Sequence, residues 1–236
     1  MTDNYQNLKH ILNFDFKHPV VYRIQIMKRR KDSGNEDMKT GQSVIEFIYL
    51  YSLIDYLKKE DHIKQTCADN NARAYLEINP KYVYSIGLAA NKLLLEDLYH
   101  RKEIESQLKS KHILNTIFDV GDLIYETIVS LDEKERGHLI NRSFPRAKNA
   151  SKRWILDVDY NDSLNQETLP EIIKTINKVG LDYNEKELNV FVNPTISGCH
   201  VIFDPTNLNV LSVLLTEKYG LTGSDIKKDN ATLLYF

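Results

Sequence analysis

The last 86 residues restrict the fold most, because strand and helix patterns alternate there in a fixed order. Short runs of β-branched and aromatic residues predict strands, and longer runs predict helices. The order is strand, helix, strand, strand, helix, strand, at residues 153–159, 169–179, 188–192, 199–203, 205–220 and 232–236. This order is typical of a split βαβ sheet, in which the first and third strands lie side by side at the centre. Both helices should then cover one face and leave the other open.

The first 149 residues show a different mixture of patterns. Strand patterns lie at 20–26, 44–51 and 72–78, and Ser52 with Asp55 predicts the capped start of a helix that runs to about residue 68. Asn79-Pro80 is typical of a helix start and precedes a largely helical pattern to about residue 130. The charged stretch 133–149 indicates a connection. We therefore predict an α/β (α+β) protein with an N-terminal α/β and helical subdomain at 1–149 and a second subdomain at 150–236.

Composition excludes several classes of protein. The net charge is −2, so any nucleic-acid binding must come from local basic patches. The two cysteines, Cys67 and Cys199, are too few for a four-cysteine zinc module and argue against a disulfide scaffold. The N-terminus lacks a signal-peptide pattern, and no apolar run approaches the roughly 18 residues of a membrane span. We expect a protein of the cytoplasm of a bacterial or phage-infected cell, with no membrane partner.

An aspartate pair is the first candidate site. In the predicted strand that contains Asp157 and Asp159, alternate side chains share a face, so both carboxylates point one way while Leu156 and Val158 point the other. Two carboxylates this close repel each other unless a cation lies between them, and hard oxygen ligands suit Mg²⁺ or Mn²⁺. The alternative is a chance pair of solvated aspartates at a strand end.

Two further elements follow along the chain. Ser197, Gly198 and His200 lie at a predicted turn and on the strand expected beside the aspartates, where a glycine admits a ligand and the hydroxyl and imidazole can donate to a phosphate oxygen. A hairpin turn with a structural histidine explains the same residues. Asp225 or Asp229, before the last predicted strand, could complete a cluster of three carboxylates, or could lie in a solvated turn.

These three elements, in this order, resemble the motifs of the archaeo-eukaryotic primase superfamily, the primase-polymerases. That family has an aspartate pair after a hydrophobic strand, then a small residue two positions before a histidine, then a third acidic residue after a hydrophobic one. The first two motifs correspond to 155–159 and 198–200. The third departs from the family pattern, because Asp225 follows Ser224, and Asp229 competes with it. The resemblance covers about residues 150–236.

The resemblance implies an RRM-like βαββαβ palm that performs divalent-metal-dependent nucleotidyl transfer, as a primase, a DNA polymerase or both. Asp157, Asp159 and the third aspartate would bind Mg²⁺ or Mn²⁺, while Ser197, Gly198 and His200 would bind a nucleoside triphosphate. A single-stranded or primed nucleic-acid template is the implied partner, together with replication proteins such as a helicase. The chain lacks the zinc-binding cysteines of many priming enzymes, so a minimal catalytic core or an inactive member fits better than a complete replication enzyme.

Basic residues in two stretches could follow a template strand, although a solvated surface explains each of them equally well. The candidates are Lys28, Arg29, Arg30, Arg146, Lys152 and Arg153. Two other functions remain open. A two-metal nuclease uses paired carboxylates as well, and a catalytically inactive primase-like module could bind nucleic acid or protein without performing chemistry.

Overall fold

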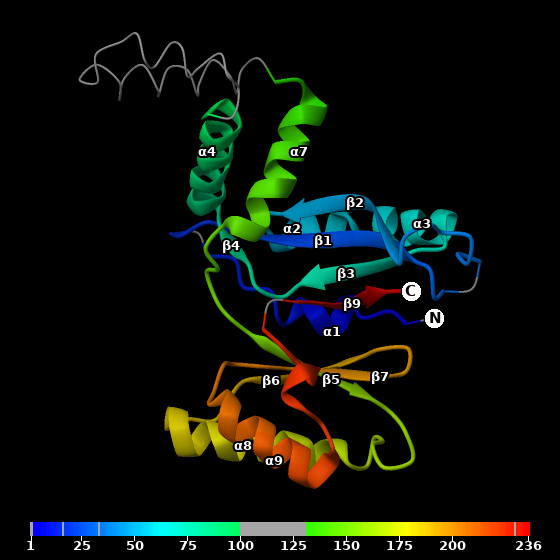
Figure 1. The fold of residues 1–236 in the computed structure, drawn as a ribbon, viewed down its shortest axis with the longest axis vertical. Coiled ribbons are helices and arrows are strands. Elements are labelled where there is room, and N and C mark those ends of the chain that lie inside the picture. The colour runs from blue at the N-terminus through cyan, green and yellow to red at the C-terminus, as the bar shows by residue number, and fades with distance from the viewer. Residues whose placement is uncertain (1, 16, 33, 100–130, 229) are drawn as a thin grey trace. The chain divides into compact units, whose positions relative to one another are not determined.

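The computed structural model describes residues 2–15, 17–32, 34–99, 131–228 and 230–236 (Figure 1). The protein is a mixed α/β protein with two antiparallel sheets and several helices, as the sequence predicted at this level. The chain divides into two compact units, one of residues 1–80 with 150–236 and one of residues 81–149. This division differs from the predicted subdomains, because the N-terminal strands group with the C-terminal segment.

The first sheet has the strand order β2-β1-β3-β9, and its neighbouring strands are antiparallel. Its strands are β1 (Val20–Arg29), β2 (Gln42–Leu50), β3 (Arg73–Glu77) and β9 (Ala231–Tyr235). Alternation along β1 buries Ile24 and Ile26 on one face. On the opposite face Arg23 forms an ion pair with Glu77 of β3. Each face of the sheet therefore has its own chemistry, one apolar and one charged.

Three helices from the first 70 residues of the chain pack against this sheet. These are α1 (Tyr5–Lys9), α2 (Leu53–Lys58) and α3 (Glu60–Asn70). The predicted helix start at Ser52 is confirmed, since its hydroxyl accepts a hydrogen bond from the backbone N–H of Asp55. The predicted single helix to about residue 68 is two helices, which meet at Lys59. The second ends at Asn71 in the left-handed conformation, with φ at 47°.

The second sheet has the strand order β6-β7-β5-β8, again antiparallel. Its strands are β5 (Trp154–Asp159), β6 (Val190–Pro194), β7 (Gly198–Phe203) and β8 (Ile226–Lys227). Helices α8 (Leu169–Asn184) and α9 (Leu208–Tyr219) lie on the same face of this sheet (Figure 1). Leu156, Val158 and Val201 pack with these helices in one apolar core. The predicted pairing of the first and third strands, β5 and β7, is confirmed.

The last strand of the second sheet differs from the prediction. Residues 232–236 were predicted as the last strand of the split βαβ sheet, but β9 pairs with β3 of the first sheet, with Leu76 opposite Thr232. The short β8 occupies the place beside β5 and pairs Ile226 with Leu156. The physical reason is burial, since the residues from Thr232 to Tyr235 are buried in succession. At the edge of the first sheet, β9 also contacts α1 and β6 of the second sheet, so both of its faces are covered.

Two predicted helix ends were wrong. Helix α8 continues through Gly180 to Asn184, because Gly180 is a packing position where a Cβ would collide with the side chain of Leu188. Helix α9 begins after Asn207, whose side chain caps the N–H of Val210, and not at residue 205 as the sequence predicted. The Asp204 carboxylate instead accepts a hydrogen bond from the Asn189 side chain, so its capping capacity is used outside the helix.

Residues 81–149 contain β4 (Lys81–Tyr82), α4 (Val83–Tyr99), α7 (Glu133–Ser143) and a short 3₁₀ helix, η2 (Phe144–Arg146). The predicted helix start at Pro80 is displaced, because β4 comes first. The predicted connection 133–149 contains α7, which starts with a capping box between Asp132 and Glu135. The helical pattern predicted for 100–130 lies outside the described residues. In the described part of the chain, no helix has the length and apolar composition to cross a membrane.

Candidate active site on the second sheet

Strand β5 presents the aspartate pair as the alternation predicted. Leu156 and Val158 are 0% and 1% exposed in the core beneath the sheet. Asp157 and Asp159 lie on the opposite face, where Asp157 is half-buried and Asp159 exposed. The strand is fixed in this orientation because turning it over would bury two carboxylates and expose two apolar side chains.

Asp157 lies directly opposite His200 of β7, and its Oδ1 is 3.4 Å from the imidazole Nε2. The hydrogen bond to His200 lowers the pKa of Asp157 below its usual range, against the opposing effect of burial. The positive charges of Lys227 and Lys31 lower this pKa further. Because Lys31 follows β1 and Lys227 belongs to β8, cations from both sheets act on this carboxylate.

His200 is bonded through both ring nitrogens. Its Nδ1 lies 2.9 Å from the hydroxyl of Thr232, which also accepts a hydrogen bond of 2.7 Å from the Asn193 side chain. Asn193 donates in addition to the backbone carbonyl of Leu233. Thr232 and Asn193 are buried, so β9 of the first sheet packs on the same face of the second sheet as the His200 side chain. The sequence predicted His200 beside the carboxylates as a phosphate donor, and its contact with Thr232 could not be anticipated from residues 32 positions apart.

Asp159 and Ser197 meet at the end of the β6–β7 hairpin. The Ser197 hydroxyl donates to Oδ1 of Asp159 over 2.9 Å, and the register pairs Asp159 with Gly198. A Cβ at position 198 would overlap the backbone carbonyl of Val158, so glycine is required by the close approach of β5 and β7. The sequence had given this glycine the role of admitting a ligand, and the neighbouring strand supplies the steric reason.

The third carboxylate of the predicted cluster is directed elsewhere. Asp225 lies next to β8, but its carboxylate accepts hydrogen bonds from the backbone N–H and the hydroxyl of Thr222, over 2.6 and 3.0 Å. It thereby caps the short 3₁₀ helix η3 (Gly223–Asp225). Asp229 lies outside the described residues. Within the described ranges, no three His, Cys, Asp or Glu residues are grouped so that they could hold a metal ion.

A pocket of about 590 Å³ adjoins the Asp159 end of the sheet, and the sequence gave no signal for it. Its walls come from the β6–β7 hairpin and the segment after β5, including Tyr160, Gln166, Thr195, Ser197 and Gly198. The hydroxyl and amide groups give this pocket hydrogen-bonding capacity beside an exposed carboxylate. A sequence pattern cannot indicate it, because the walls come from segments about 30 residues apart.

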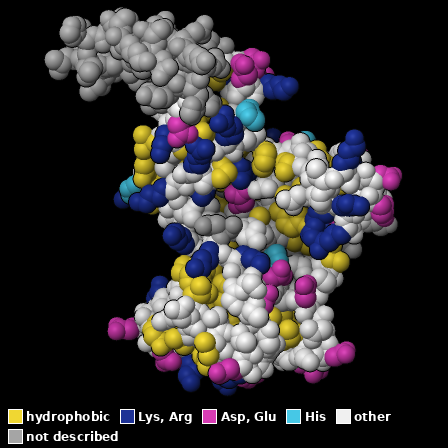
Figure 2. Space-filling view, viewed as in Figure 1, with side chains coloured by type: hydrophobic (Ala, Val, Ile, Leu, Met, Phe, Trp, Pro, Cys, Tyr) yellow, Lys and Arg dark blue, Asp and Glu magenta, His cyan; other side chains and the backbone are white. Residues whose placement is uncertain are grey.

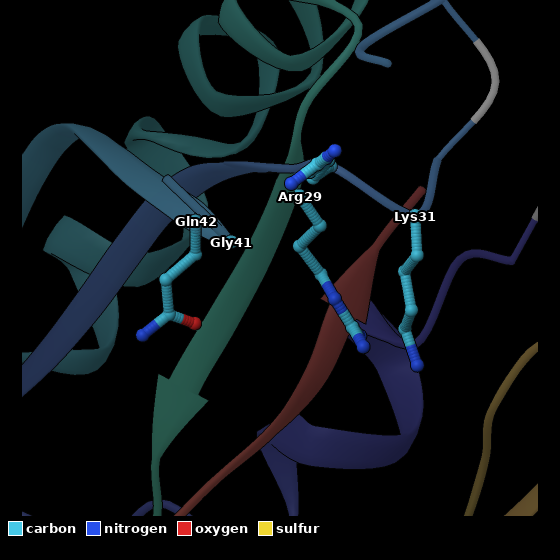
Figure 3. Close-up of a pocket in the computed structure, with 5 residues that line it drawn as sticks. Arg29, Lys31, Gly41 and Gln42 are labelled. Carbon is cyan, nitrogen blue, oxygen red and sulfur yellow. The ribbon is translucent and has the colours of Figure 1, made fainter. Parts of the chain in front are cut away.

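The basic residues named from the sequence do not form one group. Arg29 and Arg30, with Lys31, line a second pocket of about 590 Å³ at the end of the β1–β2 hairpin (Figure 3). Lys28 does not line it, because alternation along β1 turns its side chain away from that of Arg29. In Figure 2, one group of dark blue Lys and Arg side chains lies on the first sheet, and other dark blue side chains are spread over the rest of the described surface.

Of the remaining basic candidates, Arg146 and Arg153 already have protein partners, and Lys152 is the exception. Arg146 forms an ion pair with Glu96 over 2.9 Å inside the 81–149 unit. Arg153 donates to the backbone carbonyl of Ile11 over 2.7 Å and lies over the ring of Phe191. Lys152 is exposed. Arg153 therefore contributes to the packing of its own unit.

Comparisons with protein-family models, with curated proteins and with solved structures found no match to this chain. The fold assigns the chain to one broad class, the mixed α/β proteins with two antiparallel sheets, and to no family within that class. Any function must therefore be argued from the geometry of the site itself.

Proposed function

We propose that the chain is a nucleotidyltransferase of the primase-polymerase type, which uses Mg²⁺ or Mn²⁺, nucleoside triphosphates and a nucleic-acid template. The observation that carries the proposal is the Asp157 and Asp159 pair on the face of β5 that is turned away from the helices, with His200 directly opposite Asp157. In the reaction, a hydroxyl oxygen bonds to the α-phosphorus of the nucleotide and pyrophosphate leaves.

The topology of the second sheet supports this proposal. The chain order β5, α8, β6, β7, α9, β8 and the strand order β6-β7-β5-β8 match a βαββαβ arrangement, which we propose to be an RRM-like palm. The short β8 takes the place of the fourth strand. Both helices cover the opposite face of the sheet (Figure 1), so the aspartates lie on the face without helices, where Asp159 is exposed and Asp157 half-buried.

The donor set fits a magnesium-like ion. Mg²⁺ is commonly held by one or two carboxylates, with water and substrate phosphates completing its coordination. Asp157 and Asp159 supply two carboxylates on one face, and neither needs a third protein carboxylate for such a site. A divalent ion held there would stabilise negative charge on the reacting phosphate.

The other residues of the site would bind and orient the substrate. The Ser197 hydroxyl, which bonds to Asp159, can turn toward a phosphate oxygen when the carboxylate takes another partner. Lys227 and Lys31 bring positive charge toward Asp157, which favours the approach of a triphosphate. His200 keeps the Asp157 carboxylate ionised and oriented, since the bond between them lowers its pKa.

A specific observation favours a second candidate, a non-catalytic nucleic-acid-binding module. Asp157, Asp159 and Asp225 each already bond to a protein donor, namely His200, Ser197 and Thr222. An aspartate triad that has lost its metal would be expected to find such partners. This candidate retains nucleic-acid binding but lacks nucleotide incorporation.

Nucleotide incorporation on primed and unprimed templates, with Mg²⁺ or Mn²⁺, tests the proposal. We expect incorporation by the wild type and at least about a hundredfold loss in Asp157→Asn and in Asp159→Asn, because removal of electrostatic stabilisation of the reacting group costs about this much. Asp182→Asn on α8 is the matched control and should retain full activity. Degradation of the template without nucleotides would instead identify a nuclease. Template binding without Mn²⁺ binding or incorporation would favour the non-catalytic module.

A further inference from the structure

The β1–β2 pocket, formed by Arg29, Arg30, Lys31, Gly41 and Gln42, has a composition unlike that of the other described pockets. It lies where β1 ends and β2 begins. Arg29 and Gln42 are cross-strand partners, and Figure 3 shows the side chains of Arg29, Gln42 and Lys31 extending to the same side of the hairpin. The pocket thus presents three cationic side chains and one amide to a single space.

The cationic side chains of this pocket are not held in ion pairs. Among the described residues, Arg29, Arg30 and Lys31 form no ion pair with an acidic side chain, and the Asp157 carboxylate interacts with Lys31 through charge at a longer distance. One guanidinium nitrogen of Arg29 donates to the Tyr75 hydroxyl over 2.8 Å, which fixes the side chain and leaves its other N–H groups for further acceptors. Three consecutive cations repel one another, and a bound anion would relieve that repulsion.

The shape of the pocket suits a phosphate group. A Cβ on Gly41 would meet no atom within 4 Å, so the space beside its backbone is open. The planar guanidinium groups match the paired oxygens of a phosphate, and the Gln42 amide can donate a further hydrogen bond. The charged groups that line the pocket are all hydrogen-bond donors, which disfavours a cationic or apolar ligand.

The pocket also has a defined relation to the candidate active site. Arg29 donates to the hydroxyl of Tyr75 on β3, and Tyr75 lies opposite Leu233 of β9. The neighbouring Thr232 bonds to His200, which lies opposite Asp157. The pocket is therefore connected to the aspartate strand β5 through β3, β9 and β7.

We infer that the β1–β2 pocket binds backbone phosphates of a single nucleic-acid strand and so directs that strand toward Asp157. The inference rests on the proposed function for the identity of the ligand. A strand fits better than a free nucleotide, because Arg30, Lys31, Gly41 and Gln42 are exposed along the rim, where successive phosphates can lie. The pocket then positions the template, while the nucleotide binds beside the aspartates.

The test measures fluorescence anisotropy of a labelled single-stranded oligonucleotide of about 16 nucleotides over a range of salt concentrations. The variant Arg29→Gln/Arg30→Gln/Lys31→Gln should bind at least about tenfold more weakly, as expected for loss of even one charge-assisted bond. The slope of log affinity against log salt should fall by about 2, because each lost phosphate contact contributes about 0.7. The double variant Arg30→Gln/Lys31→Gln repeats the test without disturbing the bond between Arg29 and Tyr75.

Two controls separate the pocket from general charge effects. The variant Lys58→Gln/Lys178→Gln/Lys186→Gln removes the same charge from exposed positions on other elements. Lys39→Gln removes an exposed cation from the same hairpin but outside the pocket. Both should bind the oligonucleotide as the wild type does, and equal weakening in either control and the pocket variants would overturn the inference.

Further outcomes distinguish this inference from the proposed function. Wild-type oligonucleotide affinity in both pocket variants overturns the inference, whether or not nucleotides are incorporated. If the pocket variants lose affinity for inorganic triphosphate but not for the oligonucleotide, the pocket is a nucleotide site and the inference also fails. If the variants lose oligonucleotide binding while the wild type incorporates no nucleotide, the strand-binding pocket stands and the proposed catalysis fails.

Discussion

At the scale of single residues, the site is organised around the imidazole of His200. One ring nitrogen faces Asp157 and the other faces Thr232, so the ring cannot rotate without losing a hydrogen bond. The Thr232 hydroxyl is itself held by Asn193, which is buried. We propose that a histidine held in this way orients its carboxylate partner, and the phosphate-donor role that the sequence indicated stays a prediction.

The pKa of Asp157 provides a test of this role. We expect His200→Ala to raise this pKa toward the usual carboxyl value, because the bond to His200 is the largest cause of its lowering. Lys227→Gln should raise it less, since Lys227 contributes only through its charge. Carboxyl-carbon NMR titration of the wild type and both variants measures the three values. An equal rise in the two variants would contradict the assigned order of causes.

The same shift predicts how stability depends on pH. A carboxyl group whose pKa is lower in the folded state stabilises the fold above its ordinary pKa, and loses that contribution as pH falls through the lowered value. Because the Asp157 side chain is 43% exposed, the contribution should stay within about 1 kcal/mol. Urea unfolding of wild type and Asp157→Asn at pH 7 and at pH 3 should show a difference that shrinks at the lower pH. A constant difference would show that Asp157 acts by packing alone.

At the scale of elements, the contact between β5 and β7 depends on a residue without a side chain. At Gly198 a Cβ would overlap the Val158 carbonyl, and this obstacle is backbone that cannot rotate away. The two strands approach closely here because Asp159 is paired with Gly198 in the register. The position of the aspartate pair relative to the hairpin therefore rests on this glycine.

We expect Gly198→Ala to destabilise the protein by about 1–3 kcal/mol, the usual cost of overpacking, and to displace the β6–β7 hairpin. The measurement is the free energy of unfolding in urea, with amide chemical shifts of β5 and β7 as the local readout. Gly41→Ala is the control, because its added Cβ would meet no neighbouring atom within 4 Å. Equal stability of the two variants would show that the strands can separate at little cost.

Elements with a local signal could be predicted from the sequence. The strand that contains Asp157 and Asp159 could be predicted from its alternation of apolar and acidic residues. The helix start at Ser52 could be predicted because the Ser52 side chain caps the backbone N–H of Asp55, three residues later. The two-residue β8 has no period to detect, and Gly180 was taken for a helix end because a packing glycine and a capping glycine look alike in sequence. The contacts that link Asp157, His200 and Thr232 could not be predicted from the sequence, because they depend on the pairing of β9 with the first sheet.

At the scale of the larger unit, β9 joins the two sheets. It pairs with β3 of the first sheet, while its Thr232 and Leu233 accept hydrogen bonds from Asn193 of the second. Asn4, near the N-terminus, adds a further link, since its side chain donates to Pro194 and Leu233. The two sheets should therefore unfold together, because separating them would expose these buried polar groups and leave them unpaired.

Thr232→Val tests this coupling. Valine retains the shape but removes the hydroxyl, so the buried Asn193 amide loses one acceptor, at a cost of about 1–3 kcal/mol. The single tryptophan, Trp154, reports on the second sheet by fluorescence, and hydrogen exchange of β1 amides reports on the first. We expect both probes to lose the same free energy of unfolding, because β9 transmits the defect to each sheet. Thr206→Val is the control, since the Thr206 hydroxyl bonds to residues of α8, which covers the second sheet.

If Thr232→Val lowers the free energy of unfolding measured by Trp154 fluorescence and leaves hydrogen exchange of β1 unchanged, the two sheets unfold independently. The linking role of β9 would then be wrong.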